Sequence, residues 1–219
     1  MNLSLQSEVE AVELEAPVVR SESSRQFSDL DLQLCRRLDW RFLLPNSDLG
    51  NVAYLGREKT SLAAALARFS RSLSIVSSGK SARIANVQAS KFDLVVVSLP
   101  TLSNFSYARE LLRDGGYLYA EVGLSASRIK GLSAHRTDLV RAGFGKIQTY
   151  WHRPNFERCR EIVPLENKFA LDYVLSRRQA DMAGRIKSFA GRLAQSTGLL
   201  GFVMPSVSLL ACKTSEAQL

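Results

Sequence analysis

The chain has 219 residues, 46% of them apolar, which is enough to form a large buried core and excludes a disordered protein. Its three cysteines are odd in number and far apart, which argues against a disulfide scaffold or a cysteine-based zinc site. We expect no metal site, since two histidines are also too few for a histidine-rich centre. A formal net charge of +8 permits an anionic partner without identifying it.

The N-terminal residues 1–28 are predicted to form a flexible acidic arm. Residues 1–30 contain six acidic and two basic residues, so the rest of the chain is more basic than the total charge suggests. The arm is interpreted either as a solvated tail or as a segment that contacts a basic surface. We find no signal-peptide pattern, and the longest apolar stretch, 198–211, is shorter than the roughly 20 residues of a spanning helix. A cytoplasmic location is therefore expected.

The middle of the chain alternates between strand and helix patterns. A short helix is expected within 29–45, before Pro45. Near-continuous apolar strands separated by helices are typical of a mainly parallel sheet that is covered on both faces. The predicted strands are 51–56, 73–76, 92–98, 117–122, 146–151 and 207–213, with a weaker one at 84–88, and the predicted helices are 62–69, 107–113 and 135–142.

The last part of the chain has a different pattern. Apolar residues recur at three- and four-residue steps over 167–196, which predicts a long amphipathic helix. If the strand at 207–213 pairs antiparallel with 146–151, residues 154–205 form a helical insertion between two sheet strands. Such an insertion is placed to cap a ligand site.

Four segments share an order and spacing with one enzyme family. They are Lys91–Ser98 (KFDLVVVS), Leu111–Glu121 (LLRDGGYLYAE), Leu139–Ile147 (LVRAGFGKI) and Ser206–Lys213. They resemble, in that order, strand four, the turn into strand five, the helix end before strand six, and the antiparallel strand seven of class I S-adenosylmethionine-dependent methyltransferases.

The resemblance implies a Rossmann-like α/β fold over residues 29–219. The sheet would be mainly parallel with an antiparallel final strand, helices on both faces and the insertion near the C-terminus. The resemblance also implies S-adenosylmethionine as cofactor, with methyl transfer to an oxygen or nitrogen of a small molecule or glycan.

The cofactor motifs differ from those of the family. The first loop, Tyr54–Thr60, has one glycine, Gly56, where the family has several. The second strand is followed by Ser77 where the family has an acidic residue for the ribose. Gly56, Ser77 and Ser98 are the cofactor-binding candidates, although Gly56 also fits a simple tight turn. The weakened motifs leave open a lost cofactor or a different ligand.

The candidate catalytic residues are His152 and Glu121. An imidazole can act as a general base near neutral pH, and Glu121 ends a strand where it can face the crevice. Beside His152, Arg153 can clamp a carboxylate or phosphate and Trp151 can stack on a ring or cation. The alternative is a strand end with a buried aromatic residue and an exposed arginine, and a solvated acid at position 121.

A basic line lies along the predicted C-terminal helix, because Arg178, Arg185 and Arg192 are spaced seven residues apart. Basic residues beside an apolar stripe suit an acidic protein partner, a phosphorylated substrate or a peripheral membrane contact. They equally suit arginines that extend to solvent beside a buried face. The line supports a second hypothesis, a catalytically inactive methyltransferase-like scaffold or pseudoenzyme. No nucleic-acid motif is found.

Overall fold

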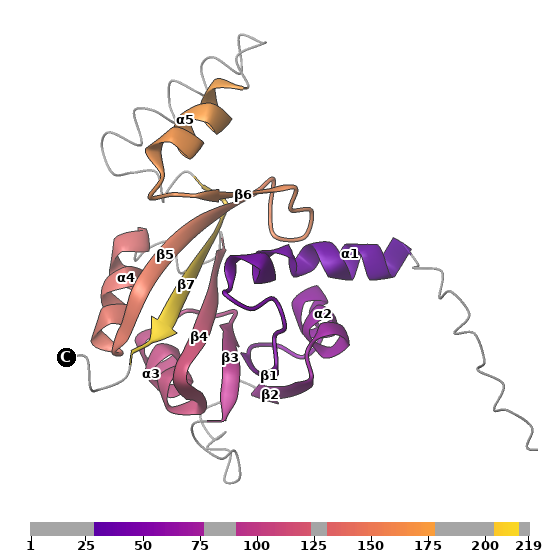
Figure 1. Ribbon diagram of the computed structural model, residues 1–219, viewed down its shortest axis with the longest axis vertical. Coiled ribbons are helices and arrows are strands. Elements are labelled where there is room, and N and C mark those ends of the chain that lie inside the picture. The colour runs from indigo at the N-terminus through magenta and orange to yellow at the C-terminus, as the bar shows by residue number, and fades with distance from the viewer. Residues whose placement is uncertain (1–28, 77–90, 124–130, 178–203, 215–219) are drawn as a thin grey trace, which may run out of the picture.

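The computed structural model describes residues 29–76, 91–123, 131–177 and 204–214 (Figure 1). The predicted arm at 1–28, the weak strand at 84–88 and the greater part of the predicted C-terminal helix lie outside these residues. Among the helices that are described, none is long and apolar enough to cross a membrane.

One seven-stranded sheet organises the described residues. Its order is β2-β1-β3-β4-β7-β5-β6. Parallel pairing joins β2, β1, β3 and β4, whereas β7 runs antiparallel to both β4 and β5. The fold is therefore the predicted Rossmann-like one, with an antiparallel final strand. The strands are β1 Asn51–Leu55, β2 Ser72–Val76, β3 Phe92–Val97, β4 Leu112–Gly123, β5 Phe144–Arg153, β6 Glu161–Pro164 and β7 Ser206–Lys213.

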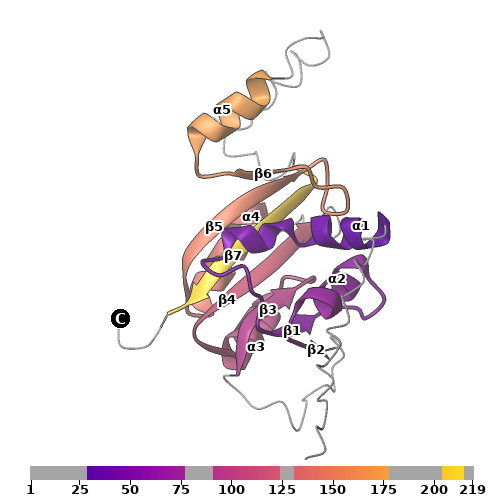
Figure 2. The same ribbon diagram turned by 45° about the vertical axis from the view of Figure 1, so that its right-hand side comes forward.

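Helices cover both faces of the sheet, as the apolar strands require. One face packs against α3 and α4, and the other packs against α1, the short helix η1 and α2 (Figures 1 and 2). Threonine caps begin two of these helices, because Thr60 Oγ1 accepts from Ala63 N and Thr101 Oγ1 accepts from Asn104 N. The helices are α1 Asp29–Arg37, η1 Asp39–Leu43, α2 Ser61–Phe69, α3 Leu102–Leu111, α4 Gly131–Arg141 and α5 Lys168–Ser176.

Two local features differ from the sequence prediction. The segment Leu111–Glu121 resembles a turn into a strand, but nearly all of it lies inside β4, where the register against β3 shifts and Gly115 has a φ of 71°. The segment 154–205 is not purely helical, because it contains β6, which pairs antiparallel with β5 and extends the sheet by one strand. Its described helix, α5, begins at the cap Asn167.

Candidate functional site

The carboxyl ends of β1, β3, β4 and β5 meet at one edge of the sheet, since β7 reverses direction between β4 and β5. Side chains alternate between the two faces of the sheet along a strand. The residues two positions nearer this edge than the core residues on the α1 side therefore lie on that same face. These are Gly56, Ser98, Glu121, His152 and Ser208. Four of the predicted site residues are thus brought to one edge and one face.

A buried ion pair fixes Glu121. Arg37, the last residue of α1, donates from both terminal nitrogens to the Glu121 carboxylate, at 2.6 and 2.7 Å. The side chains are only 5% and 10% exposed. The Arg37 Nε lies 3.3 Å from Glu157 Oε1. Both Glu121 oxygens are therefore engaged by the Arg37 guanidinium, and a catalytic role for Glu121 remains a prediction.

His152 lies in a buried polar network beside this pair. Its Nε2 lies 2.7 Å from Ser208 Oγ and 3.5 Å from Tyr119 Oη, and its Nδ1 lies 3.6 Å from Cys159 Sγ. Burial, with a smaller contribution from Arg37, lowers the pKa of His152 to about 3. This corrects the expectation of a base that titrates near neutral pH. The imidazole is neutral at physiological pH, and catalysis by His152 remains a prediction.

The N-terminal helices cover this network. The Trp40 ring of η1 stacks on Tyr119 with centroids 3.7 Å apart and planes 6° from parallel. Tyr119 donates from its hydroxyl to Glu121 Oε1 at 3.4 Å. Burial, followed by the charge of Glu121, raises the pKa of Tyr119 well above its usual value, so the phenol keeps its proton. The α1–η1 segment thus covers this edge of the sheet through the Trp40–Tyr119 stack as well as through the Arg37–Glu121 ion pair.

Gly56 directly follows β1 and lies against Tyr54 and Ser98. A Cβ at this position would approach Ser98 Oγ and the Tyr54 ring at 2.4 Å each, so no larger residue fits without movement. The packing of Ser98 and Tyr54 against this position therefore explains why it is a glycine. Ser98 directly follows β3 and donates from its hydroxyl to the Leu55 carbonyl at 3.3 Å. Contact of either residue with a cofactor remains a prediction.

Arg153 and Trp151 lie at the end of β5, as expected, and contact each other. The Arg153 guanidinium lies 4.8 Å from the centre of the Trp151 ring and donates to Glu161 Oε2 at 2.7 Å. Arg153 is thus already paired with a carboxylate of β6. Beside it, a cavity of about 360 Å³ between β6 and α5 is lined by Arg153, Glu161, Tyr173, Arg177 and apolar residues.

Several residues of this edge carry no recognisable sequence signal. Arg37 and Cys159 complete the network but belong to no motif, and Tyr119 and Ser208 lie in segments that predict strands without marking these side chains as site residues. A glutamate within an apolar strand could have indicated that a buried cation was needed, although not which of the 29 basic residues supplies it. The predicted residues Ser77, Arg178, Arg185 and Arg192 lie outside the described residues.

Comparisons with solved structures find methyltransferases at low identity. Phosphoethanolamine N-methyltransferase 2 of Haemonchus contortus, in complex with S-adenosyl-L-methionine, is 14% identical, with 84% of this chain and 53% of that chain covered and a TM-score of 0.45. A methyltransferase of Thermotoga maritima, a possible histamine N-methyltransferase, is 10% identical, with 83% and 89% covered and a TM-score of 0.46.

A predicted O-methyltransferase of Agrobacterium tumefaciens is also similar, at 10% identity, with 84% and 81% covered and a TM-score of 0.42. The present chain spans about half of the Haemonchus protein. A scan with family models finds no match, and a search of curated proteins finds no relative.

Proposed function

We propose that the chain binds S-adenosylmethionine at the carboxyl edge of its sheet and transfers the methyl group to an oxygen or nitrogen of a small molecule or glycan. One observation carries the proposal. From β1 the chain passes to β2 on one side and then to β3 on the other, so β1 and β3 flank the topological switch point of the sheet. Ligands of open α/β sheets bind at such a point. Gly56 and Ser98 directly follow these two strands.

The described residues fit the cofactor at this point through small and polar groups. Ser98 offers a hydroxyl, and the loop after Gly56 contains the exposed residues Arg57 and Glu58. Ser77, after β2, is the third predicted contact. The side of Gly56 that faces Tyr54 is filled, so the cofactor would contact the other side of this loop.

When bound, the cofactor would supply a methyl group on a sulfonium; an acceptor oxygen or nitrogen would take it as the carbon–sulfur bond breaks, S-adenosylhomocysteine would leave, and the acceptor's proton would pass to water. The residues of this chain would act mainly by positioning. The cavity between β6 and α5 has the size of a small-molecule site, and its two arginines, Arg153 and Arg177, both pair with Glu161 in its wall. His152 is neutral and hydrogen-bonded, which fits a role in holding the end of β5 against β7.

A catalytically inactive, scaffold-like relative is the second candidate. It is favoured by the internal use of two predicted site residues, because Glu121 is paired with Arg37 and Gly56 is packed by Tyr54. In that case the basic line formed by Arg178, Arg185 and Arg192 would bind an acidic protein partner, and the cofactor would not bind.

Calorimetric titration with S-adenosylmethionine and S-adenosylhomocysteine tests the proposal. We expect saturable micromolar binding that is lost in Ser98→Phe, since the larger ring fills the switch point. Ser106→Phe is the matched control, because Ser106 is exposed on α3. Circular dichroism checks that both variants fold. No binding by the unsubstituted protein at millimolar ligand would contradict the methyltransferase proposal and favour the scaffold, whereas equal binding by both variants would place the site elsewhere.

A further inference from the structure

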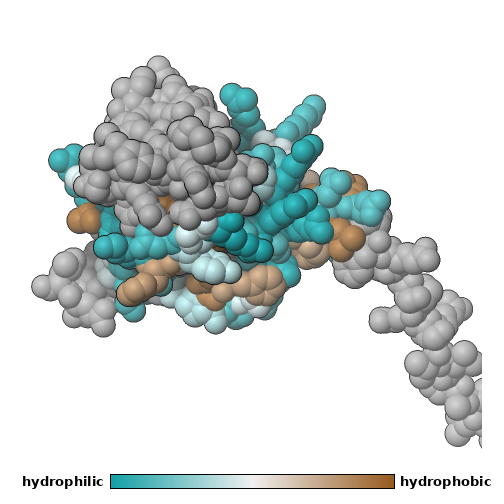
Figure 3. All heavy atoms as spheres, turned by 90° about the horizontal axis from the view of Figure 1, so that it is seen from above, coloured by the Kyte–Doolittle hydropathy of each residue, from teal (hydrophilic) through white to brown (hydrophobic). Residues whose placement is uncertain are grey.

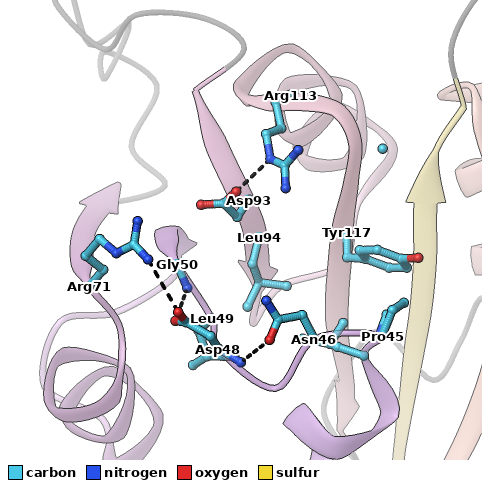
Figure 4. Close-up of a pocket in the computed structure, with 12 residues that line it drawn as sticks. Pro45, Asn46, Asp48, Leu49, Gly50, Arg71, Asp93, Leu94, Arg113 and Tyr117 are labelled. Atoms are coloured by element: carbon cyan, nitrogen blue, oxygen red, sulfur yellow. Dashed lines mark hydrogen bonds and ion pairs between the residues drawn. The ribbon is translucent and has the colours of Figure 1, made fainter.

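A second cavity lies at the opposite, amino-terminal edge of the sheet. Its volume is about 290 Å³. It is formed where the link from η1 reaches β1, where β3 begins, and where β4 shifts its register against β3 and residues 113–115 are exposed. Figure 4 shows Arg71, Arg113 and Tyr117 on three separate sides of it. Nothing in the proposed methyl transfer uses this edge.

The carboxylates of the cavity are already engaged. Asp93 accepts from Arg113 Nε at 2.6 Å and from the backbone of Asn51 at 2.8 Å. Asp48 accepts from the backbone of Gly50 at 3.0 Å and from Arg71 at 3.4 Å. Each of the four carboxylate oxygens therefore has a donor, as the dashed lines in Figure 4 partly show. These bonds hold both acids in place, and their charges offset those of the two arginines.

The remaining hydrogen-bonding groups of these side chains are donors. Arg113 uses only Nε, and Arg71 uses only one terminal nitrogen. Asn46 accepts from the backbone of Asp48 at 3.0 Å through its oxygen, which leaves its amide nitrogen available. Within the described residues, these remaining N–H groups make no hydrogen bond. Guanidinium and amide donors that line one cavity favour an acceptor-rich group such as a carboxylate or phosphate.

The walls of the cavity are apolar. Leu44, Pro45, Leu94 and the half-buried ring of Tyr117 also line it. An inorganic ion would leave these walls in contact with water, whereas a ligand with an apolar or ring-shaped body would cover them. The shape and chemistry together require an anionic head and a compact apolar body.

We propose that this cavity is a second ligand site, which binds a small organic anion, either a phosphomonoester or a carboxylate. The anionic group is held by Arg113, Arg71 and the Asn46 amide, and the apolar body lies against Pro45 and Tyr117. The site is independent of the sheet's carboxyl edge, and the protein needs no cofactor to fill it.

Phenyl phosphate, benzoate, inorganic phosphate and benzyl alcohol are the probes, titrated into the full chain and followed by calorimetry and by chemical shifts of backbone amides. We expect saturable binding of phenyl phosphate or benzoate, with the better of the two identifying the head group. Weaker binding of inorganic phosphate is expected, and none of neutral benzyl alcohol. No saturation by either aromatic anion up to about 10 mM, or equal binding of benzyl alcohol, would overturn the proposal.

Asn46→Asp is the decisive variant. The carboxylate still accepts from the backbone of Asp48, so the turn is kept, but a donor is replaced by a negative charge. Affinity should fall by about tenfold or more, and Arg113→Gln should cause a similar loss. Arg141→Gln removes one exposed charge from α4 and is the matched control, with affinity unchanged. Unchanged affinity in Asn46→Asp would overturn the assignment, and titration of the same variant with S-adenosylmethionine keeps the two sites distinguishable.

Discussion

Two arginine–carboxylate pairs at opposite edges of the sheet have the same shortest distance and different surroundings. Arg37–Glu121 at the carboxyl edge and Arg113–Asp93 at the amino edge both have a nitrogen–oxygen distance of 2.6 Å. The first pair is 5% and 10% exposed, and the second is 57% and 31% exposed. The distance alone therefore does not determine how much such an ion pair contributes to the stability of the fold. Burial decides how much is lost when one partner is removed.

The same difference separates their uses. Arg37 donates from both terminal nitrogens to Glu121, so it fastens α1 to the sheet. Arg113 directs one nitrogen at Asp93 and keeps the others toward a cavity, where a ligand can reach them. At the carboxyl edge, both terminal nitrogens of Arg37 are used in holding the fold together. At the amino edge, Arg113 keeps N–H groups that can bind a ligand.

Removal of Arg37 should have the largest effect on stability. Arg37→Met leaves the buried Glu121 carboxylate without its cation, which should lower the free energy of unfolding by about 3–5 kcal/mol. Urea denaturation followed by Trp fluorescence measures the loss. The double variant Arg37→Met/Glu121→Leu should recover most of it, because no charge is then buried alone. A single-variant loss below about 1 kcal/mol would mean that the buried pair behaves like an exposed one.

Gly56→Ala should have the next largest effect. Its Cβ would lie 2.4 Å from both Ser98 Oγ and the Tyr54 ring, so the end of β1 must move. We expect a loss of about 1–3 kcal/mol in thermal or urea denaturation. Gly123→Ala is the matched control, since a Cβ there meets nothing within 4 Å. Equal stability of both variants would show that Tyr54 moves aside easily.

Stability should also decrease in acid because of His152. Its folded pKa of about 3 lies below the ordinary 6.5, so the unfolded chain binds a proton first as pH falls. The contribution of the neutral imidazole is complete above pH 6.5 and is lost between pH 6.5 and about 3, at about 1 kcal/mol per pH unit.

Urea midpoints at several pH values between 7 and 5 measure this slope. His152→Gln retains an amide that can bond Ser208 and should flatten the slope, while carboxylates elsewhere contribute equally to both proteins. An unchanged slope in His152→Gln would place the acid sensitivity elsewhere.

Arg113→Gln should have the smallest effect on stability. The pair is exposed, and Asp93 keeps its hydrogen bond from the backbone of Asn51. A loss below about 1 kcal/mol is expected in urea denaturation, and salt should reduce it further. A loss as large as that of Arg37→Met would remove the distinction between the two edges.

The fold could largely be predicted because buried parallel strands have a strong local pattern. The apolar run at 92–98 is found as β3 Phe92–Val97, and the predicted antiparallel pairing of the final strand with β5 is confirmed. The short strand β6 was missed, since its four residues contain Pro164 and show no clear alternation. The position of β6 depends on its pairing with β5, and a local sequence pattern does not predict such pairing.

The candidate site was less predictable for a physical reason. Sequence patterns place a residue at the end of a strand, and that is where Glu121 and His152 are found. They do not show which other side chains contact that residue in the folded protein. Arg37 is 84 positions away from Glu121, and Ser208 is 56 positions from His152, so their contacts arise only through tertiary packing. Those contacts determine whether each group is free to react.

The place of β7 in the sheet also constrains how the protein folds during synthesis. β4 and β5 are neighbours only through β7, which follows both in the sequence. Until β7 has emerged from the ribosome, the sheet consists of two separate parts, and each has an exposed strand edge on which other chains can pair. Completion of the sheet must await these long-range contacts, which slows folding and lengthens the period in which aggregation competes.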